Sequence, residues 1–226
     1  MLFRSPFIVL EDAEFESCCQ TAVTARMINT GQSCIAAKRF IVVEDIANAF
    51  EDRVKELMQD RKAGNPANSD TQLAPLAKPE FVEDIDRQVK ESIEMGATLL
   101  LGGKRMKGKG NFYEPTVLTN VTPDMPVFKE ETFGPVLSVI RVQNEKEAIE
   151  VANQSQYGLG GCVWTSSVER GEKIARTVES GAMFVNGMTK SDPRLPFGGI
   201  KNSGYGRELS HYGIKEFVNI KTIWIA

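Results

Sequence analysis

The sequence has few residues that bind transition metals. His211 is the single histidine, and the four cysteines, Cys18, Cys19, Cys34 and Cys162, form no C-x-x-C pair. A Cys/His zinc site needs several such residues at short spacings, so the sequence predicts no metal centre. Adjacent cysteines such as Cys18 and Cys19 rarely meet the geometry of a mutual disulfide, and we expect four free thiols in a reducing compartment.

Long apolar runs and a strong charge of either sign are also absent. No stretch approaches the roughly 18 apolar residues that cross a membrane, and residues 1–6 lack the apolar core of a signal peptide. The formal net charge of -3 calls for no nucleic-acid or polyanion partner. No G-x-G-x-x-G loop that cradles phosphates precedes a predicted helix. We therefore expect a cytoplasmic protein that binds neither membranes nor nucleic acid.

What the sequence does contain is an alternation of strand and helix patterns. Hydrophobic residues make up 42% of the 226 residues, enough to bury a sizeable core. Short apolar runs predict buried strands at 7–10, 40–43, 98–103, 113–117, 136–142, 160–164 and 183–186. Helical spacing of apolar residues predicts helices at about 11–28, 46–61 (capped by Asp45), 79–95, 145–153 (capped by Asn144) and 168–179. This order is typical of an α/β fold in which helices cover a sheet.

The C-terminal stretch has a different character. Residues 216–225 alternate as a strand does and are rich in Ile, Val, Phe and Trp. An exposed strand of this kind promotes aggregation unless something covers it, so we expect a partner subunit and a homodimer or higher homo-oligomer. The sequence divides into an α/β domain at 1–200 and a C-terminal segment with an oligomerisation strand at 201–226.

One short stretch points to chemistry. Residues 29–34, Asn-Thr-Gly-Gln-Ser-Cys, form a loop of small residues between a predicted helix and the strand at 40–43. Helix and strand can hold such a loop while Cys34 remains accessible, and a thiolate attacks carbonyl carbon readily. The N–H groups of the loop can stabilise the thiolate and a developing oxyanion. On local sequence alone, however, a lone cysteine is more often a buried structural residue.

Ordered motifs carry a family resemblance. Residues 29–34 (N-x-G-Q-x-C), 130–136 (E-E-T-F-G-P-V), 157–159 (Y-G-L), 196–204 (P-F-G-G-x-K-x-S-G) and 206–208 (G-R-E) resemble motifs of the aldehyde dehydrogenase superfamily. Within that superfamily, the sequence is most similar to bacterial succinate-semialdehyde-type enzymes. The resemblance implies the catalytic domain, with a mostly parallel, helix-covered sheet, and NAD or NADP as cofactor.

The resemblance also implies roles for individual residues. Cys34 would be the nucleophile that forms a thiohemiacetal with a small aldehyde and then a thioacyl intermediate that water hydrolyses. Glu131 would accept hydrogen bonds from the ribose hydroxyls of the nicotinamide half of the cofactor. Phe133, Leu159 and Phe197 would line the nicotinamide and substrate end of the tunnel. Without the resemblance, Glu131 would be read as a surface acid and the three apolar residues as core.

The sequence departs from the family pattern in three respects. Family chains are about twice as long, and their first half holds the cofactor domain, so we expect that domain to be missing or supplied by a separate chain. In an ungapped match, the glutamate that serves as general base falls one position before Met1. Many succinate-semialdehyde enzymes have an arginine six positions before the nucleophile, where Ile28 stands here. Lys190 or Arg194 could supply that charge instead, unless both simply belong to a solvated loop.

Three hypotheses for function follow. The first is an aldehyde dehydrogenase whose activity needs the missing half. The second is an inactive truncated remnant that folds and self-associates without turnover. The third is a residual thiol esterase activity at Cys34, which requires only the nucleophile and an oxyanion site.

Overall fold

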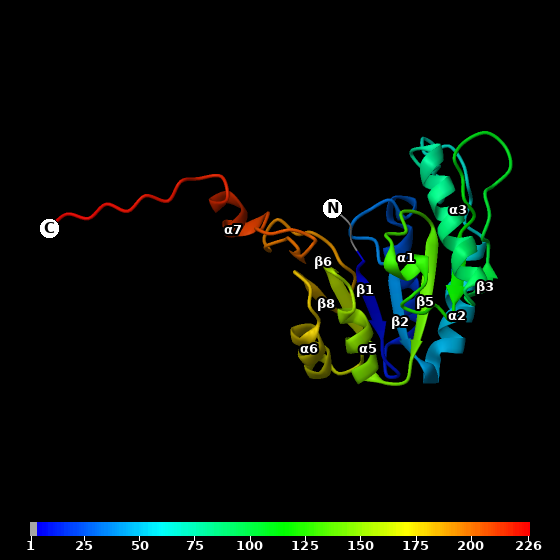
Figure 1. The fold of residues 1–226 in the computed structure, drawn as a ribbon, viewed down its shortest axis with the longest axis horizontal. Coiled ribbons are helices and arrows are strands. Elements are labelled where there is room, and N and C mark those ends of the chain that lie inside the picture. Colours follow the sequence, from blue (N-terminus) through cyan, green and yellow to red (C-terminus); the bar gives the residue numbers. More distant parts are fainter. Residues whose placement is uncertain (1–3) are drawn as a thin grey trace.

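A seven-stranded sheet organises the protein. The computed structural model describes residues 4–226 (Figure 1). The sheet has the order β3-β4-β5-β2-β1-β7-β8, in which only β3 is antiparallel to its neighbour, and β6 and β9 form a separate antiparallel pair. The strands are β1 (Pro6–Val9), β2 (Arg39–Val43), β3 (Thr98–Leu101), β4 (Thr116–Thr119), β5 (Val136–Val142), β6 (Tyr157–Gly158), β7 (Gly161–Trp164), β8 (Met183–Val185) and β9 (Ile200–Lys201). The predicted α/β fold with a mostly parallel, helix-covered sheet is confirmed.

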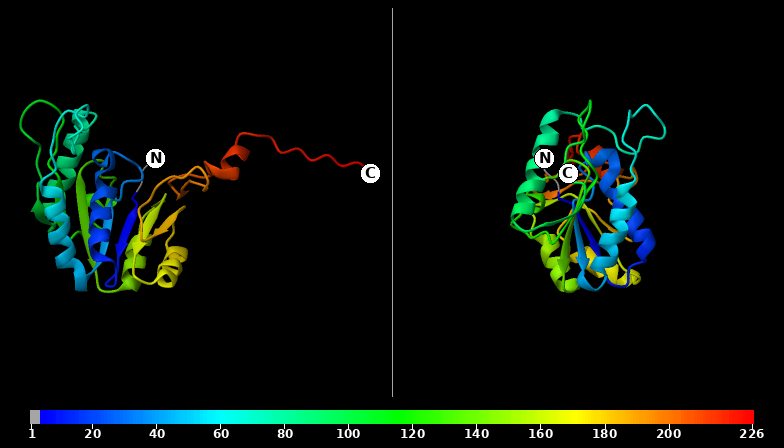
Figure 2. Two further views of the ribbon diagram at one scale, coloured as in Figure 1. Left: turned by 180° about the vertical axis from the view of Figure 1, so that it is seen from behind. Right: turned by 90° about the vertical axis from the view of Figure 1, so that its right-hand side faces the viewer.

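Helices cover both faces of the sheet (Figure 2, right). The helical segments are α1 (Phe15–Met27), the short η1 (Ile28–Gly31), α2 (Glu44–Gln59), α3 (Pro79–Glu94), α4 (Pro126–Lys129), α5 (Glu145–Asn153), α6 (Val168–Thr177) and α7 (Ser210–Lys215). One buried cluster joins α1 and α2 to one face of the sheet. A second cluster joins α3, α5 and α6 to the other face. The result is a sheet between two layers of helices.

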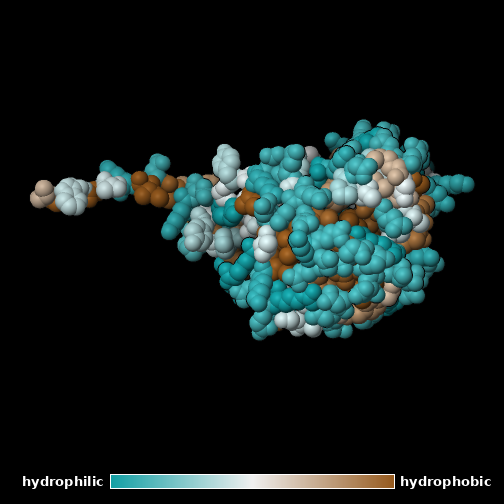
Figure 3. Space-filling model, turned by 60° about the horizontal axis from the view of Figure 1, so that its bottom comes forward, coloured by the Kyte–Doolittle hydropathy of each residue, from teal (hydrophilic) through white to brown (hydrophobic). Residues whose placement is uncertain are grey.

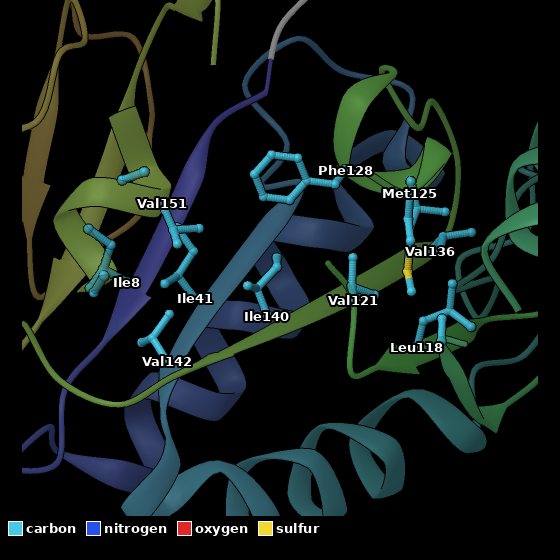
Figure 4. Close-up of a cluster of buried hydrophobic side chains, with 14 of the residues drawn as sticks. Ile8, Ile41, Leu118, Val121, Met125, Phe128, Val136, Ile140, Val142 and Val151 are labelled. Carbon is cyan, nitrogen blue, oxygen red and sulfur yellow. The ribbon is translucent and has the colours of Figure 1, made fainter. Parts of the chain in front are cut away.

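The central strands are mostly apolar because both faces of the sheet are covered, although Arg39 of β2 and Ser138 of β5 are buried polar residues. In β1, Phe7 and Val9 contribute to the cluster beneath α1 and α2, whereas Ile8 belongs to the opposite cluster. Ile41 of β2 and Ile140 of β5 continue the second cluster (Figure 4). Strand side chains alternate between faces, so a continuous apolar run fills two cores at once.

Three local predictions need correction. The strand β3 is an exposed edge strand and not a buried one, with Leu99 40% exposed. Asp45 does not cap α2, because the chain is already helical from Glu44. The helix α1 begins at Phe15 instead of Glu11, since Glu11 lies in a turn after β1 and pairs with Arg170. The predicted cap Asn144 is confirmed by its bond from the Glu147 N–H.

The predicted strand at 216–225 is not formed in the single chain. Residues 219–226 have no regular secondary structure and project away from the sheet (Figures 1 and 3). Phe217, Ile220 and Trp224 are 87–89% exposed. A strand needs a hydrogen-bonded neighbour, and no part of residues 4–226 supplies one here. The predicted division at residue 200 and the role of this segment in assembly stay predictions.

Removal of residues 217–226 should barely change the stability of the fold. These side chains bury little surface, so we expect the free energy of unfolding in urea to stay within about 0.5 kcal/mol of the parent value. Phe50→Ala is the contrasting variant, because Phe50 is 0% exposed; it should cost about 3–5 kcal/mol. A deletion as costly as Phe50→Ala would show that the segment packs on the fold in solution.

Candidate functional site

The predicted site residues gather where loops enter parallel strands. The loop with Cys34 leads into β2, and the loop with Glu131 and Phe133 leads into β5. Leu159 lies in the short connection that enters β7. The strands β5, β2, β1 and β7 are consecutive neighbours and run in parallel. Their amino ends therefore share one edge of the sheet, and the four residues lie along it.

The backbone before Cys34 is unusual. Asn29, Thr30 and Gly31 all have positive φ angles, of 48°, 57° and 78°. The turn is closed by the Gln32 N–H, which donates to the Asn29 carbonyl at 3.0 Å. A side chain on residue 31 would place its Cβ 2.0 Å from the Gly134 carbonyl oxygen. Only glycine fits this position, and it allows the Cys34 loop to touch the loop that precedes β5.

Cys34 differs from the other three thiols in its exposure. Cys18, Cys19 and Cys162 are buried, whereas Cys34 is half-buried, and all four are free. Burial raises the pKa of the Cys19 thiol to about 12 and raises the pKa values of Cys18 and Cys162 as well. Buried thiols of this kind are inert. Cys34 is thus the cysteine available for chemistry.

A buried lysine, Lys38, holds the Cys34 loop. Its side chain is 1% exposed, and its Nζ donates to the carbonyl oxygens of Ser33 (3.0 Å), Cys34 (3.3 Å) and Ala36 (3.0 Å). Nζ also lies 3.2 Å from Oε1 of Glu131, in an ion pair that is not aligned as a hydrogen bond. Lys38 therefore links the two loops through one charged group.

Burial dominates the titration of this lysine. The pKa of Lys38 is lowered to about 8, chiefly by burial and then by the positive charge of Arg26, while the attraction of Glu131 partly offsets both. Arg26 is fully buried and donates to the Gly31 carbonyl at 2.7 Å. Burial lowers its pKa too, with Glu131 opposing. Two buried cations thus flank one carboxylate beneath the loop.

Glu131 is a largely buried acid whose acceptor capacity is only partly used. Its side chain is only 8% exposed, and Oε1 accepts no hydrogen bond from residues 4–226. Phe133 lies beside it, with Lys38 Nζ 6.0 Å from the ring centroid and the ring of Phe81 at 6.1 Å. The carboxylate keeps acceptor capacity for hydroxyl donors, so its chemistry fits the predicted contact with a ribose.

Phe197 lies with a second group of residues. A cavity of about 230 Å³ is lined by 181–184, Lys190, Asp192 and 195–197, and neither Cys34 nor Glu131 lines it. The Leu159 carbonyl accepts from the Ala182 N–H at 3.1 Å, which ties Leu159 to the same wall. Leu159 is buried, whereas Phe197 is half-buried.

The two candidate charges for a substrate differ in availability. Arg194 is held by Asp192 through two bonds of 2.9 and 2.6 Å. Lys190 lines the cavity beside Phe197. Ile28 lies in η1 and brings no charge. Lys190 is therefore the better placed of the two cations.

Sequence reasoning missed the buried cations around the loop. Arg26, Lys38 and Arg39 are 0–2% exposed. Arg39 donates to the carbonyls of Val151 and Ala152 at the C-terminal end of α5, each at 2.9 Å. The available signal was position: Lys38 directly precedes β2 and Arg39 is its first residue, and charged residues beside a buried apolar run need partners to be buried.

Membrane-spanning helices and clustered metal ligands are not features of the described chain. None of the helices in residues 4–226 combines the length and apolar character needed to cross a membrane. Within the same residues, no group of three or more His, Cys, Asp or Glu side chains is placed to bind a metal ion.

Fold and site together define a class of protein. They describe an α/β protein with an accessible thiol at the amino ends of parallel strands, beside a buried carboxylate. A family model described as Aldehyde dehydrogenase family matches residues 4–223. The chain belongs to the aldehyde dehydrogenase family, as its motifs predicted.

Individual relatives agree with this assignment. The probable succinate-semialdehyde dehydrogenase (NADP+) of Synechocystis sp. is 52% identical over 221 residues, which are 98% of this chain and 49% of the relative. A solved structure concerned with cofactor and substrate selection by Gox0499 superposes with a TM-score of 0.96 at 48% identity, covering 99% of this chain and 49% of that one. Succinate-semialdehyde dehydrogenase from Burkholderia pseudomallei superposes with a TM-score of 0.95 at 37% identity, covering 98% of this chain and 46% of that one. The chain thus spans about half the length of these relatives.

Gly31→Ala should reveal the close approach of the two loops. The new methyl group would collide with the Gly134 carbonyl, whereas Gly108 also has a positive φ but no atom within 4 Å of where a Cβ would lie. Gly108→Ala therefore controls for backbone strain alone. We expect Gly31→Ala to lower the free energy of urea unfolding by about 1–3 kcal/mol more than Gly108→Ala. Equal losses would show that the loops are not in contact.

The buried lysine predicts a specific pH dependence of stability. Unfolding returns the Lys38 pKa from about 8 to 10.5, so between these values the unfolded chain binds more protons. The stability of the parent relative to Lys38→Met should rise with pH across this window and should be lowest, and constant, below pH 8. Urea unfolding at several pH values measures the difference. A difference independent of pH would mean that Lys38 titrates normally in the folded chain.

Proposed function

We propose that this chain supplies the nucleophile and the cofactor-side carboxylate of an NAD(P)-dependent aldehyde dehydrogenase. The observation that carries the proposal is the link from the Cys34 loop through Lys38 to Glu131, with an ion pair of 3.2 Å. The chain spans about half the length of these relatives, and the enzyme we propose also includes a cofactor-binding half. An oligomer, or pairing with a separate chain that holds the cofactor domain, belongs to the same proposal.

Cys34 would bind the substrate covalently in both halves of the reaction. The thiolate attacks the aldehyde carbon, and the carbonyl oxygen becomes the oxyanion of a thiohemiacetal. Bound NAD(P)+ supplies the acceptor for the hydride that leaves this carbon. Cys34 then holds the acyl group as a thioester, and attack by water releases the carboxylic acid and returns the thiol. Loop N–H groups would stabilise the oxyanion in each half.

The described residues fit the nicotinamide end of the cofactor. Glu131 would accept hydrogen bonds from the ribose hydroxyls, because its Oε1, although paired with Lys38 Nζ at 3.2 Å, accepts no aligned hydrogen bond within residues 4–226. Phe133 would exclude water beside it, since its ring packs on Phe81. Leu159 and Phe197 would shape the route by which an aldehyde reaches the thiol. These apolar walls strengthen electrostatic interactions in the site by excluding solvent.

Succinate semialdehyde is the substrate we favour. The Synechocystis relative carries that substrate in its name. The substrate has a carboxylate at the end away from the aldehyde, and Lys190 lines the cavity next to Phe197. A cation at that place would pair with the distal carboxylate.

The exposed C-terminal segment favours a second candidate function, that of a chain that folds and self-associates without turnover. Its apolar side chains give the chain a means of self-association that requires no catalysis. An oligomer that dissociates when residues 217–226 are removed, in a protein that forms no NAD(P)H under any condition, would support this alternative over the enzyme.

Turnover tests the enzymatic proposal directly. The chain is mixed with succinate semialdehyde and NADP+ or NAD+, alone and with the amino-terminal half of the Synechocystis relative, and absorbance at 340 nm is followed. We expect cofactor reduction in the mixture and its loss, by at least about a thousandfold, in Cys34→Ala. Cys19→Ala, which removes a buried thiol on α1, is the matched control and should retain activity. Failure of every mixture, or equal activity in Cys34→Ala, would refute the proposal.

A further inference from the structure

Three carbonyl oxygens of the nucleophile loop converge on one ammonium group. Lys38 Nζ binds the carbonyls of Ser33, Cys34 and Ala36 at 3.0–3.3 Å. Ammonium has three protons to donate, and here each faces a backbone carbonyl, with the Glu131 carboxylate nearby. A buried lysine is costly to desolvate, so this arrangement holds the loop in one conformation by satisfying that charge.

The carbonyl directions decide where the N–H groups point. In a trans peptide unit, the C=O and N–H bonds point to opposite sides. The Ser33 carbonyl shares its unit with the Cys34 N–H, and the Cys34 carbonyl shares its unit with the Ile35 N–H. Both carbonyls point inward to Lys38, so both N–H groups point away from the buried side. Within residues 4–226, neither N–H donates a hydrogen bond.

We propose that Lys38 is a positioning residue that turns the Cys34 and Ile35 N–H groups outward, where they stabilise the oxyanion formed at Cys34. The inference rests on the proposed function only in taking Cys34 as the nucleophile. Glu131, from the loop before β5, lies 3.2 Å from Nζ and attracts the ammonium, which partly offsets the repulsion by Arg26 of α1. Lys38 acts by fixing the direction of the backbone peptide units, and it does not touch the substrate.

Two reagents separate oxyanion stabilisation from thiol reactivity. p-Nitrophenyl acetate acylates a thiolate through a tetrahedral oxyanion and releases p-nitrophenolate. Iodoacetamide alkylates the same thiolate by displacing iodide from a saturated carbon, without any oxyanion. Both rates scale with the thiolate fraction, so their ratio at Cys34 reports the oxyanion donors. Neither reaction needs a cofactor, and mass spectrometry of the Cys34 peptide measures both in the chain as it is.

Lys38→Met should lower the ratio of acylation to alkylation about tenfold or more, since loss of an oxyanion donor costs about 10²–10³ in rate. Lys146→Met is the matched control, because Lys146 is 87% exposed on α5; its ratio should stay within about twofold of the parent. Lys38→Gln keeps a donating group on a shorter side chain and should give an intermediate ratio. If circular dichroism shows that Lys38→Met is unfolded, Lys38→Gln carries the test by the same criterion.

Three results would overturn the inference. A Lys38→Met ratio equal to that of the parent would show that the lysine does not orient the donors. A fall of both rates together, with the ratio unchanged, would assign Lys38 to thiolate formation or loop stability alone. A parent ratio equal to that of glutathione would show that no donors are presented. If the ratio falls as expected while no mixture reduces NAD(P)+, the inference stands and the proposed function fails.

Discussion

Parallel pairing of β1, β2, β5 and β7 is the constraint on which the candidate site depends. Each of these strands is entered from the same edge, so loops that are far apart in sequence become neighbours in space. The order of the strands sets the order of the site: the Glu131 loop lies beside the Cys34 loop, and Leu159 follows beyond β1. The chemistry therefore depends on the sheet register, which places these loops side by side.

Buried cations at this edge bind mainly backbone carbonyls, although Arg26 keeps Nε and Nη1 without a partner among residues 4–226. Lys38 binds three carbonyls and one carboxylate, Arg26 binds the Gly31 carbonyl, and Arg39 binds two carbonyls at the end of α5. A helix end carries partial negative charge, which suits Arg39. Carbonyl partners fix backbone directions in a way that a simple ion pair between side chains does not. The carbonyls that compensate for the burial of these cations thus also fix the conformation of the loop.

Much of the fold was predictable from apolar patterns. The candidate site residues come from motifs, and the buried groups that support their loops were not predictable. The runs at 7–10, 40–43 and 136–142 are strands because buried parallel strands are apolar on both faces. Patterns failed where the structure of a segment depends on its neighbours. The run at 98–101 does not reveal that it lies at the sheet edge, and residues 216–225 have no neighbouring strand within residues 4–226. Cys34 and Glu131 were identified by resemblance. Lys38 was missed, because its importance comes from the direction of three carbonyls that no pattern of side chains encodes.

Gly31 and Gly134 give the two loops a shared evolutionary constraint. Gly31 has no room for a side chain against the Gly134 carbonyl, and Gly134 itself has none against Ile85. A change at either glycine requires a compensating shift of the neighbouring backbone or side chain. The thiol and the carboxylate can therefore diverge little in relative position as the family adapts.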